Sequence, residues 1–183
     1  DLSFLITAAT GGDGINPESE KAMNAFFHMH NASYNILNGY GMTETGSSVC
    51  TNMQNRSMAG SIGIPLPYMT LAVFDEKCDE LPYGKQGELC VKGPSIMNGY
   101  CGRAVSENAS TLKQHKDGTL WVHTGDMAHV TEDGFVYVDG RIKRIIIREG
   151  GFKVFPNLIE EVLMKVPGVD YCAVVGKRVC KNL

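Results

Sequence analysis

Residues 34–44 have the sequence YNILNGYGMTE, in which a short apolar segment leads into a glycine-rich turn. Residues 34–37 predict a short buried strand, and glycines after a strand let a ligand approach the backbone closely. The ring of Tyr40 can stack on a base, the Thr43 hydroxyl can donate to a phosphate oxygen, and the Glu44 carboxylate can hold Mg²⁺. Taken alone, the turn is weak evidence, because glycine–aromatic–glycine turns are common structural loops.

A strand, a glycine turn and a helix are expected before this stretch. Residues 3–9 predict a short buried strand that ends near Gly11-Gly12-Asp13-Gly14, a turn with neither the dinucleotide-binding nor the P-loop spacing. Asn16 is a suitable N-cap, and Pro17 suits the first helical position. The apolar side chains that follow have helical spacing, and they form an apolar face of Ala22, Met23, Phe26, Phe27 and His30. Strand, turn, helix and strand in this order indicate an α/β unit over residues 1–59.

The pattern changes after residue 60, where short strand candidates alternate with turns. The expected strands are residues 70–75, 88–92, 120–123 and 135–138. Turn signals such as Asp117-Gly118 and Asp133-Gly134 separate them, and a modest helix is expected over residues 105–113. Residues 60–140 therefore predict a small antiparallel barrel or sandwich.

A third unit is expected from residue 141 to residue 183. Residues 145–147 and 152–155 flank a Glu149-Gly150-Gly151 turn and predict a hairpin. Pro156 then opens a helix that Pro167-Gly168 ends, and residues 169–175 predict a further strand.

Composition excludes several classes of function. The chain has 183 residues, a formal net charge of −3 and no massed lysines or arginines, so we expect no nucleic-acid partner. No apolar run is long enough to span a bilayer, and no secretory leader pattern opens the chain, which together indicate a cytoplasmic protein. Both ends look cut, so we expect a piece of a longer polypeptide.

The six cysteines form no CxxC pair, and histidines are not interleaved among them at zinc-ligand spacing. A disulfide framework is arithmetically possible, but the chain is larger than typical disulfide-stapled domains. We therefore expect free, reduced and mostly buried thiols.

Two further loop motifs bear groups that bind sugars and phosphates. Asp126 in Thr124-Gly125-Asp126 follows a predicted strand, where its carboxylate can accept hydrogen bonds from vicinal hydroxyls. Arg141 can make a fork of hydrogen bonds to ribose or phosphate oxygens, and Lys143 lies at the expected domain border. Alone, each motif is as well explained by a capped turn or by solvated cations.

The order of the motifs is more specific than any one of them. A Gly-Gly turn, YGxTE, a GEL…G…GY segment that starts at Gly87, TGD and a Gly-Arg pair follow one another between about Leu5 and Val175. This order resembles the adenylate-forming superfamily of acyl-CoA synthetases, non-ribosomal peptide adenylation domains and luciferases, most closely an AMP-forming acyl-CoA synthetase. The resemblance implies an α+β (mixed α/β) fold: the end of a large N-terminal domain with a small antiparallel β-barrel-like subdomain, then the start of a small α+β C-terminal domain.

The resemblance also implies a reaction and a site. Such enzymes activate a carboxylic acid with ATP and Mg²⁺ as an acyl-adenylate and transfer the acyl group to CoA. The implied catalytic residues are Thr43, Glu44 and the hinge residue Lys143, and Glu44 would bind the metal. The implied nucleotide- and cofactor-binding residues are Gly12, Asp13, Gly39, Tyr40, Gly41, Met42, Thr43, Asp126, Val138, Arg141 and Gly151.

Two alternatives and one departure accompany this interpretation. The acceptor thiol could instead be a carrier-protein phosphopantetheine, or the chain could be a non-catalytic nucleotide- or acyl-binding fragment. Asp13-Gly14 stands where Ala-Pro or a similar pair usually follows the Gly-Gly turn. The family's phosphate loop would lie before Asp1 and its catalytic lysine beyond Leu183, so we expect residues 1–183 alone to be inactive.

Overall fold

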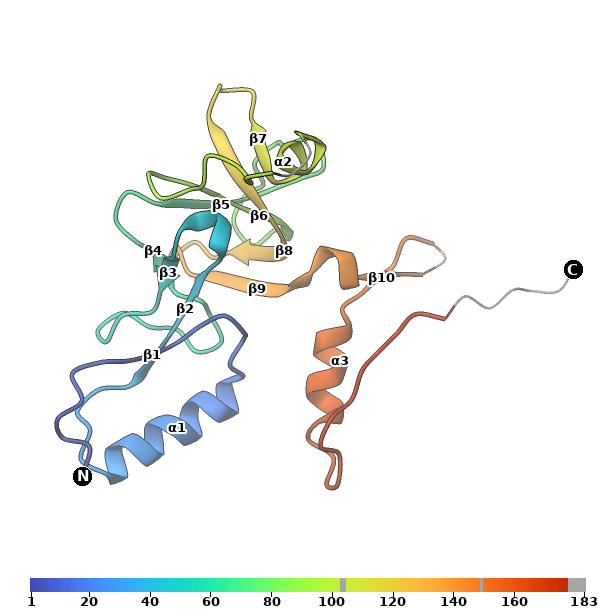
Figure 1. The fold of residues 1–183 in the computed structure, drawn as a ribbon. Coiled ribbons are helices and arrows are strands. Elements are labelled where there is room, and N and C mark those ends of the chain that lie inside the picture. Colours follow the sequence, from blue (N-terminus) through green and yellow to red (C-terminus); the bar gives the residue numbers. More distant parts are fainter. Residues whose placement is uncertain (103–104, 149, 178–183) are drawn as a thin grey trace, which may run out of the picture.

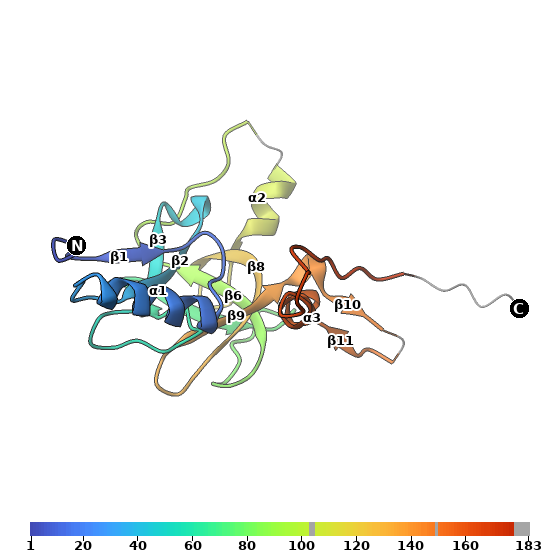
Figure 2. The same cartoon turned by 90° about the horizontal axis from the view of Figure 1, so that it is seen from below.

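The computed structural model describes residues 1–102, 105–148 and 150–177 (Figures 1 and 2). Within these ranges the strands form a four-stranded sheet, a five-stranded sheet and a two-stranded hairpin. The mixed α/β class expected from the sequence is confirmed.

The four-stranded sheet holds the glycine-rich turn. Its strands, in spatial order, are β1 (Ala8–Thr10), β2 (Ile36–Gly41), β3 (Ser48–Thr51) and β4 (Ile64–Pro65). β1 pairs in parallel with β2, and the helix α1 (Pro17–Met29) makes the crossover that parallel neighbours need. The expected strand over residues 3–9 is wrong in its extent, because only residues that face β2 form a ladder.

The helix α1 begins as predicted but does not bury its apolar face. Asn16 caps it, with its Oδ1 accepting the Ser19 N–H at 2.8 Å. Phe26 and Met29 are nevertheless 54% and 79% exposed, and α1 has no buried residue. The apolar face of α1 is therefore exposed, and the helix meets β2 through Asn24, whose Oδ1 accepts the Ile36 N–H at 2.7 Å.

The five-stranded sheet is antiparallel and open. Its members are β5 (Thr70–Phe74), β6 (Gly87–Lys92), β7 (Leu112–Gln114), β8 (Leu120–Val130) and β9 (Val136–Arg141). The long strand β8 pairs with β6 on one side and with both β7 and β9 on the other. The sequence correctly predicted antiparallel strands here, and the described strands do not close into a barrel. Between β6 and β7 runs the helix α2 (Val105–Thr111).

One core joins the two larger sheets. Its buried members are Val49, Cys50, Ile62, Leu71, Val73, Leu89, Val91, Ala128, Val130 and Val136. The Ile62 N–H donates to the Val136 carbonyl at 2.9 Å, so the backbone also links the sheets. This shared core fixes the position of β2 relative to β8 and β9. All five described cysteines are free, as expected. Only Cys50 and Cys90 among them are buried, so the expectation of mostly buried thiols is wrong for the described residues, and Cys180 lies outside them.

The last part of the described chain extends away from these sheets (Figure 1). After the 3-10 turn η2 (Ile142–Arg144) come β10 (Ile146–Ile147), β11 (Lys153–Val154) and α3 (Pro156–Leu163), which confirm the expected hairpin and helix. The strand predicted over residues 169–175 is wrong. There the Val174 N–H donates to the Glu160 carboxylate of α3 at 2.9 Å. This N–H is therefore not available for a hydrogen bond to a neighbouring strand.

Among the described residues, no helix combines the length and apolar character that crossing a lipid bilayer requires.

Candidate functional site

A cleft of about 480 Å³ lies where β1 and β2 end. The residues that line it are Ala9, Thr10, Gly11, Gly12, Gly39, Tyr40, Gly41, Met42, Thr43, Gly46, Ser47, Ser48 and Thr51. Parallel neighbours end at the same edge of a sheet, which is why the Gly-Gly turn after β1 meets the last residues of β2 and the turn that follows them. The cleft therefore unites six of the residues predicted from the sequence to bind nucleotide.

Glycine at position 41 permits the tight turn beside the cleft. A Cβ atom on Gly41 would lie 2.2 Å from the Ser47 carbonyl oxygen, a distance that no real contact allows. The chain then enters the 3-10 turn η1 (Thr43–Thr45), in which the Thr45 hydroxyl donates to the Met42 carbonyl at 2.9 Å. As a result, Thr43 lies exposed at the wall of the cleft.

Behind the cleft, Asp126 joins the two sheets. It accepts the Tyr40 hydroxyl on Oδ2 at 2.6 Å, and its Oδ1 pairs with Arg141 Nε at 3.0 Å. Asp126 and Arg141 are register partners on β8 and β9, whereas Tyr40 belongs to β2. The Asp126 side chain is 4% exposed and that of Arg141 59%, so a buried carboxylate meets a cation that still reaches solvent.

Burial sets the proton affinities of this group. It raises the pKa of the Asp126 carboxyl above its ordinary value of 3.8, against the opposing effects of the Tyr40 hydroxyl and Arg141. It also raises the pKa of the Tyr40 hydroxyl, and the neighbouring Asp126 charge adds to that shift. Tyr40 is therefore a neutral donor at physiological pH.

Glu44 has one carboxylate oxygen engaged. The Tyr100 hydroxyl donates to its Oε1, and the Glu44 carbonyl accepts the Met97 N–H at 2.8 Å. No hydrogen bond to Oε2 is found among the described residues. A half-buried carboxylate next to Thr43 fits Mg²⁺, which proteins often hold through one or two carboxylates together with substrate phosphates.

Beyond the six residues that line the cleft, and Glu44, Asp126 and Arg141 described above, four residues predicted from the sequence lie apart from the cleft. Val138 packs against the core, and Asp13 is exposed with its Oδ1 accepting the Gly14 N–H. Lys143 is exposed on η2, and Gly151 lies in the loop of the β10–β11 hairpin, which points away from β1 and β2 (Figure 2).

Other residues of the site were quoted in motifs but given no role. Thr124 accepts the Asp126 N–H on its hydroxyl at 3.0 Å and an Arg141 N–H on its carbonyl at 3.3 Å, so it fixes both charged groups. Tyr100 orients Glu44 from 56 residues away. The position of Thr124 two residues before Asp126 is a usable sequence signal. The contact between Tyr100 and Glu44 has no signal in the local sequence.

Comparisons with known proteins show the family of the chain. The profile of the AMP-binding enzyme family matches residues 1–101. A long-chain-fatty-acid–CoA ligase of Escherichia coli O6:H1 is 42% identical over 142 residues, which are 77% of this chain and 24% of that protein. The chain thus spans about a quarter of the length of that relative.

Solved structures give the same result. ATP-bound MatB from Rhodopseudomonas palustris superposes with a TM-score of 0.78 at 32% identity, over 93% of this chain and 32% of that one. The o-succinylbenzoate–CoA synthetase of Bacillus subtilis, complexed with its acyl-adenylate intermediate, gives 0.82 at 28% identity, over 97% and 34%. Profile, sequence identity and fold agree, and the chain belongs to the AMP-binding enzyme family.

Proposed function

We propose that this chain is part of an ATP-dependent, AMP-forming ligase that activates a carboxylic acid as its acyl-adenylate and transfers the acyl group to CoA. The observation on which the proposal rests is that Tyr40 contributes to two places at once. Tyr40 lines the cleft, and its hydroxyl donates a hydrogen bond to the buried Asp126.

This arrangement suits an adenosine. A base stacked on the Tyr40 ring brings its ribose toward Asp126, whose carboxylate can accept hydrogen bonds from vicinal hydroxyls. Arg141 is the complementary group, because its exposed guanidinium pairs with Asp126 and retains donors for ribose or phosphate oxygens. Charge-assisted hydrogen bonds of this kind are about twice as strong as neutral ones.

The phosphates would lie along the turn that follows β2. The exposed Thr43 hydroxyl is a donor for an α-phosphate oxygen, and Glu44 would hold Mg²⁺ through the oxygen that Tyr100 leaves unoccupied. Mg²⁺, when bound, neutralises negative charge on the phosphates. The glycines at positions 39 and 41 keep the floor of the cleft free of side chains.

In the first half-reaction, a carboxylate oxygen of the acid attacks the α-phosphorus, the bond to pyrophosphate breaks, and an acyl-adenylate forms. In the second, a CoA thiol loses its proton and attacks the acyl carbonyl, and AMP leaves. Because both steps build up or move negative charge, the residues contribute mainly positioning and charge stabilisation. Thr43 and Arg141 would serve the oxygens on which that charge develops.

Lys143 would act as a hinge between the two half-reactions. It is exposed on η2, directly after β9, and the hairpin and α3 that follow extend away from the sheets. Rotation there would bring the Gly150-Gly151 loop to the thiol path. The names of the E. coli and B. subtilis relatives favour CoA over a carrier-protein thiol as acceptor. The joint presence of Thr43, Glu44, Asp126 and Arg141 argues against a non-catalytic binding module.

Binding of a hydrolysis-resistant acyl-adenylate analogue tests the proposal. We expect a series of acyl-sulfamoyl adenosines to bind more tightly than sulfamoyl adenosine itself. Two buried methylenes, at about 0.8 kcal/mol each, suffice for about a tenfold gain. The guanosine counterpart is the control for base recognition. Equal affinity for the acylated and unacylated adenosines would contradict acid activation in this cleft.

A further inference from the structure

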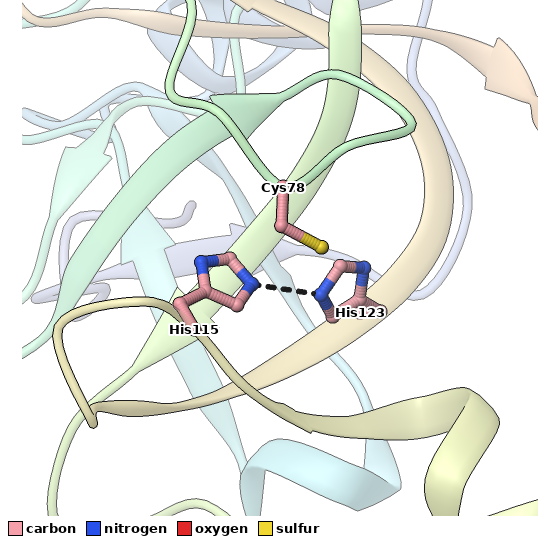
Figure 3. A group of neighbouring side chains, drawn as sticks. All are labelled: Cys78, His115 and His123. Atoms are coloured by element: carbon pink, nitrogen blue, oxygen red, sulfur yellow. Dashed lines mark hydrogen bonds between the residues drawn. The ribbon is translucent and has the colours of Figure 1, made fainter.

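Three metal-ligating side chains converge on the five-stranded sheet, away from the nucleotide cleft (Figure 3). Cys78 lies in the turn between β5 and β6, His115 follows β7, and His123 lies on β8. Each offers one ligand atom, and these three atoms all lie within 4.8 Å of one another. The two Nε2 atoms are 3.0 Å apart, and the Cys78 sulfur points toward the same space.

The separations suit one shared ion. Two nitrogens that each lie about 2.0–2.1 Å from a tetrahedral zinc are about 3.3 Å apart, and a thiolate sulfur at about 2.3 Å lies slightly farther from each. The histidine nitrogens therefore need to move apart by only a few tenths of an ångström. The Cys78 sulfur would close the third position.

The surroundings hold the two imidazoles in place. His115 and His123 are 8% and 5% exposed, whereas Cys78 is partly exposed and leaves one open side. The Phe74 ring meets His115 edge-on at 4.4 Å, and Trp121 stacks on it at 5.5 Å. Such an apolar wall limits water access and favours direct ligation.

A carboxylate orients His123 from its far side. His123 Nδ1 lies 2.8 Å from Glu88 Oε2, which assigns the proton to Nδ1 and turns the Nε2 lone pair into the cluster. In zinc sites, a carboxylate often accepts the remaining ring N–H of a histidine that binds the metal, and Glu88 stands in that position. Lys113 Nζ, 3.5 Å from the same Nδ1, stands beside the Glu88 carboxylate and supplies no ligand.

The backbone at Cys78 is also unusual. Its φ of 60° lies in the left-handed region, where glycine or asparagine is favoured. The Asp75 carboxylate imposes this turn by accepting the Lys77 and Asp79 N–H groups at 2.8 and 2.9 Å. The turn thereby directs a cysteine side chain toward the two histidines.

We propose that Cys78, His115 and His123 bind Zn²⁺, in a site separate from the magnesium position expected at Glu44. A thiolate with two imidazoles is a donor set that suits zinc and disfavours Mg²⁺ and Ca²⁺. Water supplies the fourth ligand. The spacing of these residues along the sequence matches no zinc motif. Cys78 is distant from both histidines in the sequence, and only the fold brings the three residues together.

Binding requires a defined proton balance. Without metal, the 3.0 Å contact is a hydrogen bond in which His115 Nε2–H donates to His123 Nε2. On binding, the His115 proton moves to Nδ1 and the Cys78 thiol loses its proton to solvent. One sulfur and two nitrogen bonds to zinc then form as the hydrated ion releases all but one of its water ligands. No electron is transferred. One proton is therefore released per ion when three protein ligands and a neutral water complete the site.

Cobalt substitution tests the site directly. The metal-free chain is titrated with Co²⁺ and then with Zn²⁺, alongside the Cys78→Ser, His115→Gln and Glu88→Gln variants, and Cys101→Ser as the matched control at an exposed thiol. We expect one Co²⁺ per chain, a thiolate-to-cobalt charge-transfer band, and loss of that band when Zn²⁺ is added. Cys101→Ser should retain the band, and Cys78→Ser and His115→Gln should lose it.

Glu88→Gln should bind the metal about 10–100-fold more weakly without losing the band, as expected for an outer-shell carboxylate. Circular dichroism of each metal-free variant shows whether it is folded. Absence of the band in the wild-type chain, or an undiminished band in folded Cys78→Ser, would overturn the proposal. Either result would mean that His115 and His123 form a hydrogen-bonded pair that does not bind metal.

Discussion

Asp126 is the residue on which the candidate nucleotide site depends, because it links Tyr40 of one sheet to Arg141 of the other. A buried carboxylate is costly unless it is paired and hydrogen-bonded, and here both oxygens have partners. Ribose hydroxyls can replace or supplement those partners without leaving the charge unpaired. The residue thus combines a structural role between the sheets with the proposed binding role.

The raised pKa of Asp126 predicts a pH dependence of stability. Its pKa is higher in the folded chain than the ordinary value of 3.8, so the folded state holds the proton more tightly. The resulting stabilisation is fully present below pH 3.8 and is lost as the pH rises through the folded pKa. We expect the free energy of unfolding of the wild type, relative to Asp126→Asn, to fall across that window. Urea unfolding at a series of pH values measures this difference, and a rise with pH would contradict it.

At the scale of single residues, the sequence identified donors and acceptors but not all their partners. Thr43 could be predicted because it stands in the turn that follows β2. Asp126 and Arg141 were expected in loops after strands, but they lie on β8 and β9, and Asp126 is buried. The contacts of Tyr100 with Glu44 and of Glu88 with His123 join residues far apart in the chain. No periodicity or spacing indicates such contacts, so only the fold could supply them.

At the scale of elements, the Gly41→Ala variant tests how the end of β2 shapes the cleft. Replacement of Gly41 by alanine drives a Cβ atom into the Ser47 carbonyl, so we expect a loss of about 1–3 kcal/mol in the free energy of unfolding. Gly14→Ala is the matched control, because nothing lies within 4 Å of the Cβ it would add and its backbone is not left-handed. That change should stay within about 0.5 kcal/mol. Equal losses in the two variants, measured by urea unfolding, would show that the turn after β2 is not tightly packed.

Elements with strong local signals were predicted well. The helix α1 has an N-cap residue and a proline at its start, and the helix α3 has a proline at its start and an apolar stripe. Both helices begin where the sequence predicts. Strands depend on neighbours, and their predicted bounds were less accurate. β2 begins at Ile36 and not at Tyr34, β8 extends to Val130 and not only to His123, and two further errors lie where a partner is missing or different. Residues 3–7 extend beyond β2, and residues 169–175 contact α3 through Glu160.

At the scale of the whole molecule, two apolar helix faces are left open. Phe26 on α1 and Val162 on α3 are 54% and 66% exposed, although both helices have apolar side chains at core spacing. Contiguous apolar surface of this kind marks a place where other protein packs. The chain spans 24% of the length of the E. coli relative.

We therefore expect residues 1–183 alone to bind nucleotide without completing adenylation. Positioning and charge stabilisation at the α-phosphorus supply most of the rate, and the resemblance implies that a phosphate loop and a lysine other than those in residues 1–183 contribute to them. The measurement is ATP-dependent pyrophosphate release with a panel of carboxylic acids, with the full-length E. coli ligase as the reference. Turnover close to that of the reference would refute the expectation.

The most direct test of the nucleotide site is calorimetric titration of the chain with AMP. The wild type is compared with Asp126→Ala and with Asp139→Ala, a matched control on β9 whose carboxylate pairs with His129 and Gln86 outside the cleft. Loss of hydrogen bonds to a charged group, at about 1.5–3 kcal/mol, predicts about 10–150-fold weaker binding for Asp126→Ala. Asp139→Ala should bind as the wild type does. Unchanged affinity in Asp126→Ala, or no binding by the wild type, would contradict an adenosine site built on Tyr40, Asp126 and Arg141.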